Sequence, residues 1–217
     1  MAGIVAHSRL DECSLATNIP DNLFTGDILL FEENGDHWFQ RFCSDMMSVL
    51  TGCTLTHAAV ILRNPPAPPN TMVFGEGIFV LQHRVEDGRL RAFCTPIEEV
   101  LASVRGAVHV RRITSEATDK FIDQDKVTHY IAAIQLNPHA WLPSTPLHLL
   151  FPSHTNLFST ATVGAFLHAM GLVDEQWDYR GLTPGELLPD RLSVPWTAPD
   201  VYQDSVEAIS RDPEPPP

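Results

Sequence analysis

The chain of 217 residues has the length of one large domain, and no obvious break divides it into two. Hydrophobic residues make up 44% of it and charged residues 19%, which supplies a sizeable core and excludes wholesale disorder. The 14 Lys and Arg residues against 27 Asp and Glu give a formal net charge of -13. Proteins that bind nucleic acid usually carry clusters of Lys and Arg that neutralise phosphates. The acidic net charge of this chain therefore argues against nucleic acid as a partner.

No apolar run approaches the roughly 18–20 residues that cross a bilayer, and the first residues lack a secretory signal. The sequence therefore predicts a cytoplasmic protein without a transmembrane segment, and it leaves peripheral membrane contact open. The ten histidines show no metal-ligand spacing, and we expect neither a metal nor a cofactor. The four cysteines also match no CxxC or zinc pattern: Cys13, Cys43, Cys53 and Cys94.

The first half of the chain predicts two buried strands separated by a helix. The apolar run at residues 28–31 has the length of a buried strand. Large apolar residues at spacings of three and four over 36–51 predict an amphipathic helix. A second apolar run, 56–62, predicts the next strand, and the proline cluster at 64–70 predicts a surface loop.

The middle of the chain predicts a hairpin, a short helix and a further strand. Residues 78–82 are strand-like, Asp87-Gly88 indicates a tight turn, and 90–93 alternate as the return strand. A short helix at 96–103 and an alternating strand at 108–113 follow.

Two longer helices are predicted at 118–135 and at 159–171, the second ended by a glycine. We expect residues 1–22 to be an N-terminal extension and 23–195 to form one domain. Residues 196–217 are acidic and end in a proline-rich sequence, which predicts a mobile tail. The fold class predicted from these elements is α+β, with an antiparallel sheet packed against helices.

Five segments, taken in order, resemble a known family. They are residues 26–31, 56–62, 73–78, 96–103 and 157–166. Their order is similar to that of the circularly permuted branch of the NlpC-type papain-like superfamily. That branch includes lecithin retinol acyltransferase-like proteins, YiiX-like bacterial hydrolases and related poxviral proteins.

The resemblance implies a circularly permuted papain-like fold and a cysteine-hydrolase-type site for the amide or ester bond of a peptide or an acyl lipid. By position in the motifs, His57 corresponds to the catalytic histidine, Glu76 to the acid that orients it, and Ser159 to the nucleophile. The backbone N–H at the start of the helix that begins at residue 159 would then stabilise the oxyanion. The alternative is an inactive protein that uses the papain-like cleft to recognise a peptide or a lipid.

The family has cysteine at the nucleophile position, and this chain has Ser159. A Cys–His pair reacts as thiolate and imidazolium, whereas a serine hydroxyl must lose its proton during attack. Three origins of this serine stay open: an engineered Cys-to-Ser replacement, a natural inactive protein, or a working serine hydrolase.

Each of these residues also has a structural interpretation. Ser159 has the residue type of a helix N-cap, His57 that of a half-buried core histidine, and Glu76 that of a solvated loop acid. Cys53, four residues before His57, is a rival nucleophile, but no helix follows it that would stabilise a thiolate. Asp27 is expected to cap its loop by hydrogen bonds and is left out of the site.

Overall fold

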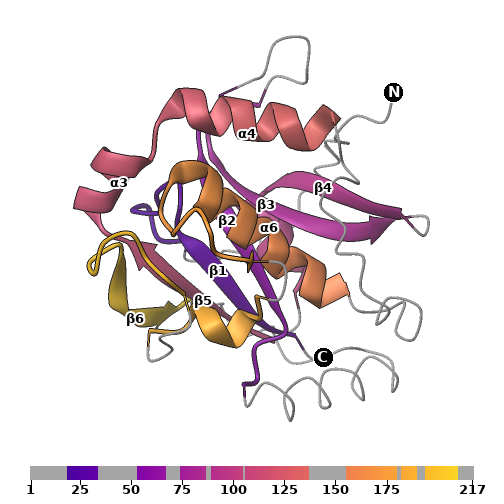
Figure 1. Cartoon of the computed structure of the whole chain (residues 1–217). Helices are drawn as coiled ribbons and strands as arrows, with labels where there is room; N and C mark the ends of the chain where they lie inside the picture. Colours follow the sequence, from indigo (N-terminus) through magenta and orange to yellow (C-terminus); the bar gives the residue numbers. More distant parts are fainter. Residues whose placement is uncertain are drawn as a thin grey trace, which may run out of the picture.

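The computed structural model describes residues 19–33, 53–66, 74–86, 89–104, 106–136, 155–179, 182–189 and 194–209. They form a mixed α/β fold around one six-stranded sheet, in the order β4-β3-β2-β1-β5-β6, and all neighbouring strands are antiparallel (Figure 1). The strands are β1 (Ile28–Glu33), β2 (His57–Arg63), β3 (Ile78–Glu86), β4 (Arg89–Pro96), β5 (Gly106–Ile113) and β6 (Tyr202–Ala208). The prediction of helices packed against an antiparallel sheet is confirmed.

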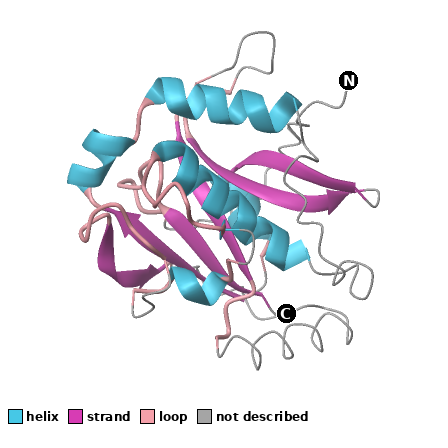
Figure 2. Ribbon diagram, in the orientation of Figure 1, coloured by secondary structure: helices cyan, strands magenta, loops and turns pink. Residues whose placement is uncertain are grey.

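Helices cover both faces of this sheet. Figure 2 shows helices of one of these faces as cyan ribbons in front of the magenta strands. The helices are α2 (Ile97–Ser103), α3 (Ser115–Phe121), α4 (Gln124–Leu136), α6 (Thr155–Met170) and the short 3-10 helix η2 (Pro184–Leu187). Of these, α4 and α6 pack on one face and α2 packs on the other. The sheet is therefore the middle layer, and two separate cores lie on its two sides.

Strand alternation divides the sheet residues between these two cores. On β2, Ala58, Val60 and Leu62 belong to the core that includes α6, which we call the α6-side core. Ala59 and Ile61 belong to the core that includes α2, which we call the α2-side core. The central strands are buried on both faces, which explains why they appear in the sequence as nearly continuous apolar runs.

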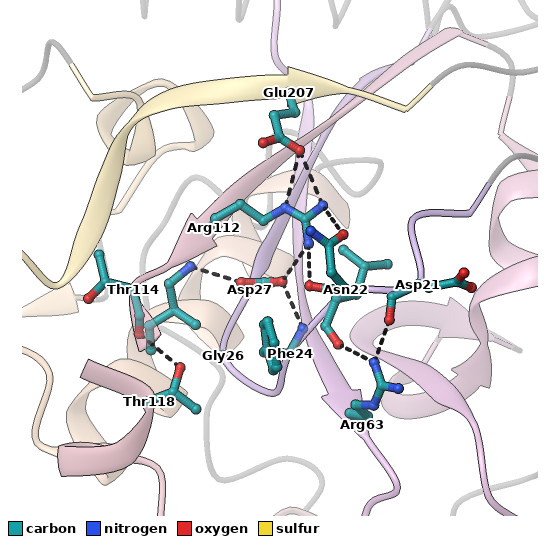
Figure 3. A network of polar contacts seen from close by, with 12 residues as sticks. Asp21, Asn22, Phe24, Gly26, Asp27, Arg63, Arg112, Thr114, Thr118 and Glu207 are labelled. Atoms are coloured by element: carbon teal, nitrogen blue, oxygen red, sulfur yellow. Dashed lines mark hydrogen bonds and ion pairs between the residues drawn. The ribbon is translucent and has the colours of Figure 1, made fainter. Parts of the chain in front are cut away.

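A buried carboxylate holds the start of β1 in place (Figure 3). The fully buried Asp27 accepts hydrogen bonds from the backbone N–H of Phe24 at 2.9 Å and of Ile113 at 2.8 Å. The Arg112 guanidinium lies 3.3 Å from the same carboxylate and also contacts Glu207 at 3.2 Å. Burial raises the pKa of the Asp27 carboxyl above its ordinary value, while these N–H groups and Arg112 lower it. The prediction that Asp27 caps its loop is confirmed.

The predictions for α3, α4 and the C-terminal segment are wrong in detail. The helix predicted at 118–135 is two helices, α3 and α4, because the Asp123 carboxylate accepts from the Asp125 N–H and starts a new helix. The tail predicted to be mobile from 196 is ordered as far as 209, where β6 pairs with β5 and the Tyr202 hydroxyl donates to the Gly26 carbonyl at 2.7 Å. Its exposed acids are those of an edge strand.

Several predicted segments lie outside the described residues: residues 1–18 of the N-terminal extension, the helix at 36–51, residues 67–70 of the proline-rich loop, the turn at 87–88 and residues 210–217. Within the part that the structure describes, none of the helices combines the length and apolarity needed to cross a bilayer.

Candidate functional site

His57 is the first residue of β2, at the end of the sheet where β1 finishes. Its Cα pairs with that of Phe31, and the centroids of the phenyl and imidazole rings are 5.2 Å apart. The imidazole is half-buried, while Phe31 is fully buried beneath it. A half-buried imidazole at a strand end is placed so that it can both be oriented by the protein and meet a ligand.

The polar partner of this imidazole is Gln82 on the neighbouring strand β3. The two side chains meet through His57 Nε2 and Gln82 Oε1 at 3.0 Å. Leu81 of β3 pairs with Val60 of β2. Gln82 is the next residue of β3, so it lies one position closer than Leu81 to the end of the sheet that holds His57. Only 3% of Gln82 is exposed, so its amide is held by its surroundings as well as by the histidine.

This contact fixes the proton on the imidazole. An amide oxygen only accepts hydrogen bonds, so His57 Nε2 must carry the hydrogen in the pair. The neutral ring then has its lone pair on Nδ1, which is the form that can remove a proton from another group. A histidine held in this form can act as a general base, with Gln82 as the group that orients it.

Glu76, predicted to be that partner, lies at the other end of the hairpin. It precedes Ile78, the first residue of β3, which pairs with Arg63, the last residue of β2. His57 is the first residue of β2, so six residues of strand separate the two ends, about 20 Å at the usual rise. Glu76 is exposed, and the structure does not bring it to His57.

Ser159 lies in α6, four residues after the helix begins at Thr155. The sequence predicted that the helix starts at Ser159. In the structure Ser159 lies inside the helix, so it is not the N-cap residue. Only the first four N–H groups of a helix lack partners within it, and the Ser159 N–H is the fifth. The expected oxyanion role of that N–H is therefore not supported, and the side chain of Ser159 lies outside what the structure describes.

The direction of α6 brings its first turn toward His57. Val173, just after the helix, bridges to Trp196, whose ring lies 5.3 Å from the Arg111 guanidinium. Arg111 pairs with Ile28, at the end of the sheet opposite His57. The 16 residues of α6 span about 24 Å, so the helix reaches back along the sheet to the end where β2 begins (Figure 1).

The helix and the imidazole nevertheless lie on different faces of the sheet. Val163 and Phe166 of α6 pack in the α6-side core with Ala58, whereas His57 alternates with Ala59 of the α2-side core. A contact between Ser159 and His57 would therefore have to pass around the end of β2.

The other candidate groups show no second catalytic arrangement among the described residues. Cys53 is half-buried, its sulfur accepts from the Leu55 N–H at 3.4 Å, and it lies against Gly185 of η2. Burial raises the pKa of the Cys94 thiol to about 12, which makes it unreactive near neutral pH. No group of three or more His, Cys, Asp or Glu side chains in the described ranges could hold a metal ion.

Gln82 was not predicted from the sequence because the expected partner of His57 was an acid, and Glu76 between two glycines fitted that expectation. The signal that could have found it is the register: His57 begins its strand, so its partner must come late in an antiparallel β3. Because a long proline-containing connection separates these strands, the sequence does not show which of their residues pair first.

Comparison with known proteins gives no relative from which a role could be transferred: no family model matches the chain, and no curated protein is significantly similar to it.

Proposed function

We propose that this chain is a papain-like hydrolase-type protein with permuted motif order, acting on an amide or ester bond of a peptide or an acyl lipid. His57 is the base, Gln82 rather than Glu76 orients it, and Ser159 occupies the nucleophile position. The observation that carries the proposal is the contact between His57 Nε2 and the buried Gln82 Oε1 at 3.0 Å.

The chemistry follows from the tautomer that Gln82 selects. His57 Nδ1 takes the Ser159 hydroxyl proton while Oγ attacks the carbonyl carbon, forming a new C–O bond. The proton passes to the leaving amine or alkoxide as the scissile bond breaks. A water molecule then attacks the acyl-enzyme with the same base, which releases the acid and restores the hydroxyl.

The position of α6 supports Ser159 as the nucleophile only in part. The first turn of the helix reaches the end of the sheet that holds His57, which favours the pairing. The helix packs on the opposite face, so the hydroxyl has to approach the imidazole past the first residue of β2.

That opposite-face arrangement favours a second candidate, a non-catalytic protein that binds a peptide or a lipid. In it, the imidazole and Gln82 would be a recognition pair that donates and accepts hydrogen bonds, and Ser159 would have no reactive role.

A Ser159→Cys variant treated with p-nitrophenyl acetate separates the two candidates. We expect the thiolate sulfur to attack the ester carbonyl, p-nitrophenolate to leave, and an acetyl adduct to appear on residue 159 in peptide mass spectra. A His57→Ala, Ser159→Cys double variant is the matched control and should lose the adduct. An adduct that is absent from residue 159, or indifferent to His57, would favour the binding protein.

A further inference from the structure

The chain enters β2 through a change of face. Leu55 packs in the α6-side core together with Ala58 and Val60. In a regular strand, residues separated by an even number share a face, so Leu55 and Ala58 should lie on opposite sides. The change of face falls on the residue between Leu55 and His57, just before the strand begins.

Thr56 is that residue, and it is tied to β1 at the carbonyl of Phe31. Its backbone N–H donates to the Phe31 oxygen at 2.8 Å, and its hydroxyl donates to the same oxygen at 3.2 Å. The Cα of Phe31 pairs with that of His57, so Thr56 is bound to the carbonyl of the residue that opposes the first residue of β2.

A second threonine holds the same segment. The Thr54 hydroxyl donates to the Glu32 carboxylate at 2.6 Å, on the residue of β1 that follows Phe31. The segment before His57 is therefore bound to the last residues of β1 at two points. The Thr54 contact is exposed, whereas Thr56 is only 7% exposed, so Thr56 makes the stronger constraint.

We propose that Thr56 is a positioning residue that holds the first residue of β2 so that the His57 imidazole stays against Gln82. A strand end frays unless it is held, and His57 has no earlier strand residue to fix its backbone. The catalytic consequence rests on the proposed function, but the placement of the imidazole does not.

The test compares Thr56→Val, which keeps the branched shape without the hydroxyl, with Thr56→Ser, which keeps the hydroxyl. Nitrogen-15 NMR of the His57 ring distinguishes the protonated from the unprotonated nitrogen. We expect the native chain and Thr56→Ser to hold the hydrogen on Nε2, and Thr56→Val to show a mixture of tautomers.

Turnover of p-nitrophenyl acetate, measured in the Ser159→Cys background, should fall about fivefold to tenfold with Thr56→Val, the range that one hydrogen bond can supply. KM should stay unchanged, and Thr56→Ser should restore the rate. A Thr56→Val variant with the native tautomer and rate would overturn the positioning role while leaving the proposed function intact. Absence of the Nε2 hydrogen in the native chain would instead count against the proposed function.

Discussion

Replacing Asp27 by alanine is expected to lower the free energy of unfolding by about 3–5 kcal/mol, because Arg112 then loses its buried partner. The change also leaves the backbone N–H groups of Phe24 and Ile113 without their acceptor. Small domains are stable by only about 5–15 kcal/mol, so the loss is a large share of the total. Urea unfolding followed by tryptophan fluorescence measures it.

Glu207→Gln is the matched control for Asp27→Ala. Glu207 contacts the same guanidinium at 3.2 Å, but its side chain is 52% exposed. Exposed ion pairs contribute about 0–1 kcal/mol, so this variant should unfold close to the native midpoint. If both variants lost the same free energy of unfolding, burial of the Asp27 carboxylate would not explain its contribution to stability.

Removing His57 is expected to cause the largest loss of activity. General base catalysis contributes about 10²–10⁴-fold, so His57→Ala should lower ester turnover in the Ser159→Cys background by that factor. Gln82→Leu should lower it by about 10–100-fold, the usual effect of removing the group that orients a functional histidine. Steady-state kinetics with p-nitrophenyl acetate, alongside circular dichroism as a check on folding, measures both effects.

Glu76→Gln is the informative comparison for Gln82→Leu. Glu76 lies at the far end of the β2–β3 hairpin, so this change should leave turnover as it was. A large effect at Glu76 and none at Gln82 would contradict the assignment of the orienting residue.

The sheet could be predicted from the sequence because its central strands are buried on both faces. In a chain without a membrane-length apolar segment, continuous apolar runs such as 28–31 and 56–62 indicate buried strands. The last strand could not be predicted, since β6 lies at an edge and presents Asp204 and Glu207 to solvent. Its pairing with β5 and the buried Tyr202, whose hydroxyl donates to the Gly26 carbonyl, make this segment part of the fold.

From the sequence, only the parts of the candidate site that depend on local structure could be predicted. His57 begins an apolar strand, which the sequence displays directly. The choice of Gln82 over Glu76 depends on how two strands pair across a long connection, and that register is a property of the folded sheet. The place of Ser159 depends on where α6 starts and which face it covers, and the apolar stripe of a helix does not give either.

The most direct test of the proposed site is the pH dependence of alkylation of a Ser159→Cys variant by iodoacetamide, mapped by peptide mass. A thiolate–imidazolium pair labels rapidly well below the ordinary thiol pKa of about 8.5, and His57→Ala should remove that labelling. Cys94, with its pKa raised to about 12, serves as the unreactive internal control. We predict rapid, His57-dependent labelling of residue 159 near pH 6. Labelling that rises only near pH 8.5, with or without His57, would contradict the proposed catalytic pair.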